Sequence, residues 1–166
     1  MKLSLRLAAF LFSAMSFSVA PSFAQTAVPF SGTFTIDESL DFSPGSPCPI
    51  LTGIISGQGK TTHLGRTTIS GTNCVTPPAN GAPPVYNFSD GKIILMAANG
   101  DTLNGTFSGS FVPTGQGTVF TVVNGTYSFN RGTGRFAAAT GSGILTGTQD
   151  IATGKGQLQA KGTISY

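Results

Sequence analysis

Residues 118–149 read TVFTVVNGTYSFNRGTGRFAAATGSGILTGTQ, and this stretch decides the fold class. Apolar and polar residues alternate over 118–129 and again over 142–149. Alternation with a period of two is typical of a β-strand that buries one face. The stretch therefore predicts two neighbouring strands, which run antiparallel because the connection between them is short.

The residues between these strands predict the form of the connection. Gly132 and Gly134 supply a turn after the first strand, 135–140 predicts a short helical corner, and Gly141 restarts the chain as a strand. Glycine suits such a turn because it adopts backbone angles that other residues avoid.

The same letters also match a nucleotide-binding pattern, GTGRFA (132–137) being read as G-x-G-x-x-A. A dinucleotide-binding loop needs a long helix directly after its glycines. Here Gly141, Gly143 and Gly147 follow, and each would destabilise a helix by about 1 kcal/mol. We therefore expect neither a dinucleotide nor any other cofactor.

Alternation with the same period recurs along the chain, and glycine, asparagine and proline separate the alternating segments. The further segments are 30–36, 51–57, 60–71, 92–98, 102–111 and 156–166. Turn residues at 89–91, 99–101 and 152–156 and a proline-rich loop at 76–84 lie between them. Glycine recurs inside the strands, as is expected where strands coil into a small barrel. The sequence predicts an all-β fold, an antiparallel closed barrel of about eight strands with one short helical turn.

Two segments also resemble a known family. FNRGTGRFAAATGSGILTGT (129–148) is similar to the G-G-T-G-x-[FY]-x-x-A-x-G segment of allene oxide cyclases, dirigent proteins and related small secreted bacterial proteins, and NGDTLNGTFSG (99–109) resembles the part before it. The resemblance implies an eight-stranded barrel of calycin type with a central cavity. Arg131 stands where the family has the first of two paired glycines. The catalytic carboxylates of the plant families have no assignable counterpart, so their activities do not carry over.

The first residues predict export. Lys2 and Arg6 precede an apolar run over 7–19, and Ser22–Ala24 resembles a signal-peptidase site. This pattern is typical of a secretory signal peptide, and the apolar run is too short for a transmembrane helix. We expect a signal peptide over 1–24 and a single barrel domain over 25–166, located in the periplasm or outside the cell.

Charge and composition limit the classes of partner. Charged residues make up only 9% of the chain, and the predicted mature part keeps seven basic against six acidic residues. No basic stripe is present to neutralise phosphates, so we expect no nucleic-acid partner. A chain with so few charges is solvated by hydroxyls and backbone, which is common among exported β proteins.

Cys48 and Cys74 are the two cysteines of the chain. A pair of cysteines in an exported protein predicts a disulfide. The alternative, a metal site, is disfavoured because two cysteines and one histidine supply too few ligands at the wrong spacing. We therefore predict a disulfide and no metal.

Few residues are candidates for chemistry. His63, the one histidine, is a candidate for general acid or base chemistry and for ligand binding. Arg66 and Arg135 are candidates for binding an anionic ligand group at a barrel mouth. Each also has a structural interpretation, which for Arg135 is capping of the turn at Gly132 and Gly134. The acids Asp37, Glu38 and Asp41 cluster after the first strand and are the one candidate for a pair of carboxylates, but we expect them to be exposed loop acids. No catalytic residue is assigned.

Four functions stay open at this point. The first is non-catalytic binding of a small apolar or amphipathic ligand inside the barrel. The second is a cyclase- or dirigent-like enzyme that acts in the cavity, and it rests on the resemblance alone. The third is an outer-membrane barrel, which the alternating C-terminal segment 158–166 favours and the scarcity of Trp and Tyr disfavours. The fourth is a surface-interaction domain without a cavity.

Overall fold

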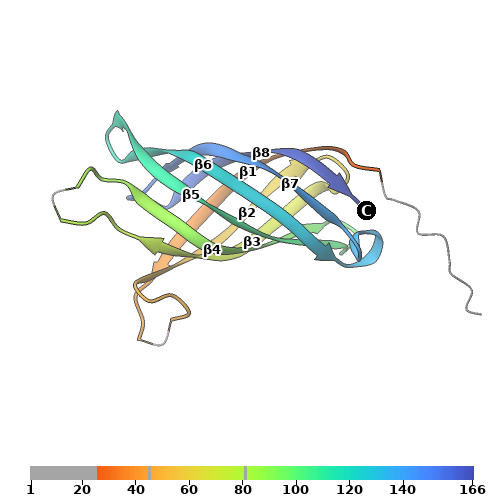
Figure 1. Ribbon diagram of the computed structural model, residues 1–166, viewed down its shortest axis with the longest axis horizontal. Coiled ribbons are helices and arrows are strands. Elements are labelled where there is room, and N and C mark those ends of the chain that lie inside the picture. Colours follow the sequence, from red (N-terminus) through yellow and green to blue (C-terminus); the bar gives the residue numbers. More distant parts are fainter. Residues whose placement is uncertain (1–25, 45, 81) are drawn as a thin grey trace, which may run out of the picture.

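The protein folds into a single closed β-barrel (Figure 1). The computed structural model describes residues 26–44, 46–80 and 82–166, so the predicted signal peptide over 1–24 lies outside the described residues. The strands are β1 (Val28–Asp41), β2 (Leu51–Thr61), β3 (Gly65–Thr76), β4 (Tyr86–Ala97), β5 (Thr102–Gln116), β6 (Val119–Gly132), β7 (Thr140–Asp150) and β8 (Lys155–Ser165). A single 3₁₀ turn, η1 (Gly134–Phe136), joins β6 to β7.

Every strand pairs antiparallel with its neighbour in the chain, and β8 pairs with β1 to close the barrel. Phe34 of β1, for example, lies opposite Gly59 of β2 and Leu158 of β8. The predicted fold class is therefore confirmed, including one short helical turn, although η1 covers Gly134–Phe136 rather than the predicted 135–140 and Thr140 already belongs to β7.

The interior of the barrel is mostly apolar, and its outer wall is mostly polar, with Ile54, Ile94, Met96 and Ile144 as exposed exceptions. Large side chains from seven of the eight strands meet in one core, against which the partly buried Leu145 of β7 packs; the core includes Phe30, Phe34, Ile36, Ile55, Ile69, Phe88, Leu95, Phe107, Phe129 and Leu158. On β1 the alternate residues Ser31, Thr33 and Thr35 are exposed. The period-two pattern in the sequence is thus the alternation between the core and the solvent.

The glycines inside the strands lie where neighbouring strands approach closely. A β-carbon on Gly105 or Gly162 would collide with the backbone carbonyl oxygen of the next strand, Ser128 and Ser142 respectively. A larger residue at these inward positions would push the strands apart. The recurrent glycines therefore permit the tight coiling that the sequence predicted.

Two local predictions were wrong. The segment 60–71 is not one strand, because β2 ends at Thr61 and a tight turn at 62–64 precedes β3. The predicted turn at 89–91 lies inside β4, where Asp90 has a φ of 52° and the register to both neighbouring strands shifts. It is a β-bulge, which uses the same turn-forming residues without reversing the chain.

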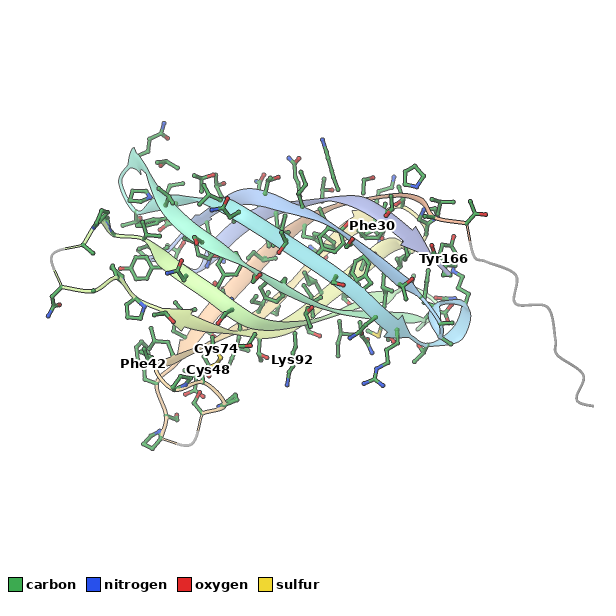
Figure 2. All side chains as sticks on the ribbon, viewed as in Figure 1. Phe30, Phe42, Cys48, Cys74, Lys92 and Tyr166 are labelled. Atoms are coloured by element: carbon green, nitrogen blue, oxygen red, sulfur yellow. A yellow bond between two sulfur atoms is a disulfide. The ribbon has the colours of Figure 1, made fainter. Side chains whose placement is uncertain are left out.

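The two ends of the barrel differ. The helical end carries η1, the β2–β3 and β4–β5 turns and the start of β1; the loop end carries the long connections after β1 and β3 (Figure 1). Cys48 and Cys74 are joined by a disulfide with a Cα–Cα distance of 5.2 Å, which ties the β1–β2 connection to β3 at the loop end (Figure 2). The predicted disulfide is confirmed.

Candidate functional site

Two of the predicted site residues meet at the helical end, where they close the barrel. His63 lies in the β2–β3 turn with a φ of 68°. Its Nε2 donates to the carbonyl oxygen of Pro29 at 2.9 Å, and its Nδ1 lies 3.0 Å from the hydroxyl of Tyr166. The guanidinium of Arg135 donates to the carbonyl oxygen of His63. Both ring nitrogens of His63 are therefore engaged within the protein.

Arg135 also covers a buried ring. Its guanidinium carbon lies 4.9 Å from the centre of the Phe136 ring, and Phe136 is fully buried beneath it. Tyr166 packs on the other side of Phe136, with the ring centres 4.9 Å apart. Arg135 and Tyr166 thus cover Phe136 at the helical end.

The remaining predicted residues lie elsewhere or serve the turn. Arg66 projects from the outer wall of β3 and does not join the other two. Gly132 ends β6, Gly134 opens η1 with a φ of 56°, and Gly141 follows the first residue of β7. The turn glycines thus take the positions that the sequence predicted.

The centre of the barrel is nearly filled. A cavity of about 40 Å³ remains among apolar side chains that include Phe30, Phe34, Phe107 and Tyr127. The hydroxyl of Tyr127 has no hydrogen-bond partner, and burial raises the pKa of Tyr127 to about 12. A cavity of this size has room for one or two water molecules but not for an organic ligand.

A larger pocket lies at the loop end. It has a volume of about 170 Å³ and combines apolar walls with a polar floor. The walls are formed by Leu40, Val75, Tyr86, Phe111, Ile151 and Gly154, and the floor is formed by Glu38 and Gln149. We call it the mouth pocket.

Glu38 is the charged group of this pocket, and it is only 9% exposed. The Gln149 side-chain amide donates to its Oε2 at 2.7 Å, whereas Oε1 has no partner. Oε1 of Glu38 and Oδ1 of Asn73 crowd the same point above Gly53, where a β-carbon would collide with both. Oδ1 of Asn73 also has no hydrogen-bond partner among the described residues.

The charge of Glu38 is not balanced by a protein cation. Within the described part of the chain, the single ion pair joins Lys155 to Asp37 at 2.9 Å on the outer surface. An ionised carboxylate that is buried among neutral groups is costly unless a cation or several hydrogen-bond donors accompany it. The floor of the mouth pocket is therefore suited to a positively charged or donor-rich group.

The sequence analysis placed Glu38 in an exposed loop, and this was wrong. β1 extends to Asp41, so Glu38 takes an inward position in line with Phe34 and Ile36. Residues 34, 36 and 38 are two positions apart, and this spacing in the sequence is the signal that places Glu38 on the inward face of the strand. Gln149 and Asn73 carried no signal of their own, because their place beside Glu38 depends on the closure of the barrel.

Metal-ligating side chains do not gather in the structure, since residues 26–44, 46–80 and 82–166 contain no group of three or more His, Cys, Asp or Glu side chains placed to hold an ion. None of the helical segments in these same ranges is long and apolar enough to cross a membrane. Comparisons with protein-family models, with curated proteins and with solved structures gave no match. The resemblance to allene oxide cyclases and dirigent proteins stays a prediction.

Proposed function

We propose that this protein is an exported β-barrel that binds a small amphipathic amine in the mouth pocket. The observation that carries the proposal is a buried carboxylate without a cationic partner at the floor of an apolar pocket. A protonated amine supplies the two things that Glu38 lacks: a positive charge, and N–H donors for its unpartnered oxygen.

The walls of the pocket favour a ligand with a compact apolar body. Tyr86 and Phe111 supply aromatic surface, and Leu40, Val75 and Ile151 supply aliphatic surface. A volume of about 170 Å³ is below the ~300–1,000 Å³ of sites for drug-sized ligands. The site therefore fits a ligand of one ring or a short chain, or one end of a longer molecule.

The location of the barrel is also part of the proposal. Residues 1–24 predict export, and a disulfide is what an oxidising compartment permits. Most apolar side chains of the described strands point inward, although Ile54, Ile94, Met96 and Ile144 are exposed. Hydroxyls such as those of Ser31, Thr33 and Thr35 point outward, whereas a lipid-embedded barrel requires an apolar band around its outer wall. This supports a barrel surrounded by water.

Catalysis in the central cavity has less support. The cyclase- or dirigent-like hypothesis needs an interior that holds an organic intermediate, whereas the cavity measures about 40 Å³. Among the lining residues of the mouth pocket, Glu38 is the one carboxylate and Tyr86 the one phenol, and none is a histidine, cysteine or lysine. The pairs of carboxylates, or of a carboxylate and a histidine, that commonly share acid and base roles are therefore not found in this lining.

The test compares an amine with its neutral counterpart. Binding of 2-phenylethylamine and 2-phenylethanol to the mature protein would be measured by calorimetry at pH 7. We expect the amine to bind at least tenfold more tightly, which corresponds to about 1.4 kcal/mol. Glu38→Gln should remove this preference, while the matched control Asp37→Asn, an exposed acid on the adjacent position of β1, should retain it.

Equal binding of the two compounds, or an amine preference that survives Glu38→Gln, would contradict the proposal. Nuclear magnetic resonance gives the location independently, because shifts should concentrate on residues of the mouth pocket such as Val75 and Phe111. Shifts confined to the helical end would also contradict it.

A further inference from the structure

The outer wall of the barrel carries a groove across β2, β1 and β8. Two adjoining depressions with volumes of about 600 and 420 Å³ share Thr33, Lys60 and Gln159. The remaining residues of the groove with outward side chains are Ser31, Thr35, Gln58, Thr62, Arg66, Gln157 and Lys161. We call this surface the outer groove; it lies on the opposite side of the barrel wall from the core and shares no residue with the mouth pocket.

Positive charge gathers in the outer groove. Lys60, Arg66 and Lys161 line it, and no carboxylate does. The nearest acid on the same face of β1, Asp37, already pairs with Lys155. Among the described residues, no ion pair or side-chain hydrogen bond engages the three cations of the groove.

The positions of two of these cations are unfavourable for the sheet itself. Lys60 and Arg66 lie directly opposite each other on β2 and β3. Like charges in directly opposed positions destabilise a sheet, on the scale of about 0.2–1 kcal/mol for a cross-strand pair. Two of the few charges of this chain therefore lie where they repel each other. Such an arrangement is expected at a site where a bound anion compensates for the repulsion.

The neutral lining of the groove suits a ligand with many hydroxyl groups. Gln58, Gln157 and Gln159 present side-chain amides that make no side-chain hydrogen bond within the described structure, and Thr33 and Thr35 present hydroxyls between them. Amides and hydroxyls both donate and accept. They complement sugar hydroxyls, whereas the cations complement carboxylate or sulfate groups.

The spacing of the cations indicates a ligand with repeated negative charges. Neighbouring strands lie about 4.8 Å apart, so Lys60 and Arg66 are separated by one such spacing. Lys161 lies on β8, two strands from β2 and two residues away along the strand direction, so about 12 Å separates the backbone positions of Lys161 and Lys60. An anionic chain that runs across the strands would meet these charges in succession.

We propose that the outer groove binds an anionic polysaccharide, with uronate or sulfate groups on Lys60, Arg66 and Lys161 and sugar hydroxyls on the glutamines and threonines. Single-stranded nucleic acid fits less well, because the aromatic ring among the lining residues, that of Phe34, faces the core and offers no platform for stacking a base. This site is independent of the mouth pocket and of the amine proposed for it.

The test uses two double variants that remove the same charge from different walls. Lys60→Thr/Arg66→Thr removes two of the three cations of the outer groove. Lys92→Thr/Arg131→Thr removes two exposed cations elsewhere, and Figure 2 shows Lys92 pointing away from the barrel. Binding of the mature protein to polygalacturonate, to a heparin fraction and to neutral dextran would be measured by calorimetry at low and at physiological salt.

We expect wild type and the control variant to bind at least one of the two anionic polymers and not dextran, with an affinity that falls as salt rises. The groove variant should bind at least tenfold more weakly than the control. It should also unfold at an equal or higher temperature than wild type, because the repulsion is removed, which separates loss of binding from loss of the fold.

Equal weakening of both variants would show an unspecific charge effect and overturn the proposal. So would equal affinity for dextran, tighter binding of single-stranded DNA than of either anionic polymer, or no binding of either polymer by wild type. None of these outcomes bears on the amine site, which Glu38→Gln tests separately.

Discussion

The side-chain amide of Gln149 donates a hydrogen bond of 2.7 Å to the carboxylate of Glu38, which lies 111 positions earlier in the chain. The two residues belong to β1 and β7, which are not neighbours in the sheet, since β8 lies between them. The bond therefore crosses the interior at the loop end and exists only in the closed barrel. It also positions Glu38, the one buried carboxylate among the described residues, so the site depends on closure.

Replacing Glu38 by Gln should stabilise the protein. The substitution removes a buried charge that lacks a cation, and the new amide can donate to the unpartnered Oδ1 of Asn73. We expect the free energy of unfolding to rise by about 1–3 kcal/mol, the cost of an unsatisfied buried polar group. Urea unfolding at pH 7 measures it.

The matched control for that variant is Asp37→Asn, which breaks the exposed ion pair with Lys155. It should change the free energy of unfolding by less than about 1 kcal/mol. A loss of more than 1 kcal/mol in Glu38→Gln would show that the carboxylate is satisfied in the folded protein, against the structure.

Tyr127→Phe should stabilise the barrel, and more so at alkaline pH. The hydroxyl of Tyr127 has no partner, and its pKa is raised from 10.0 to about 12 by burial. Below pH 10 the phenol is protonated in both the folded and the unfolded protein, and the stability of wild type is fully retained. Between pH 10 and 12 the phenol ionises in the unfolded chain first, so the free energy of unfolding of wild type falls as pH rises. Unfolding midpoints of both proteins at pH 7, 9 and 10.5 would show a difference that widens above pH 10; a constant difference would contradict the cause.

Reduction of the disulfide should destabilise the protein without changing the barrel. Closing the 26-residue separation between Cys48 and Cys74 is worth about 3.5 kcal/mol by the chain-entropy estimate. A Cys48→Ala/Cys74→Ala variant should lose up to that amount in urea unfolding, with an unchanged β spectrum in circular dichroism. Because the bond anchors the β1–β2 connection, amide exchange should increase most at the loop end.

His63→Ala should open the helical end. The imidazole bonds to Pro29 and Tyr166, and the residue has a φ of 68°, which alanine adopts reluctantly. We expect a loss of about 1–3 kcal/mol. His63→Asn, which tolerates this conformation, should lose less; equal losses would show that the hydrogen bonds alone matter.

The fold could be predicted because each strand of a barrel buries one face, so apolar and polar residues alternate along the sequence of each strand. The pattern failed where local chemistry was ambiguous. Asp90 and Gly91 form a bulge rather than a turn, and the tight turn at His63 lacks the usual Asn-Gly signal. In both cases the register of the neighbouring strand decides between the alternatives, and a single sequence does not contain it.

The sites were harder to predict, because they combine residues from distant strands. The parity of β1 points to Glu38, but its polar neighbours Asp37 and Ser39 conceal the strand. The opposition of Lys60 and Arg66 follows only from the exact position of the turn between β2 and β3. His63 and Arg135 were singled out by residue type, and the structure engages both in closing the helical end.

The pairing of β1 with β8 determines when the barrel can close. Residues 28–37 find their second partners only in residues 155–164. The barrel therefore cannot close until residues 155–164 are available to pair, because the first and last strands of the described chain form the seam. Before that pairing forms, β1 and β8 are both open sheet edges.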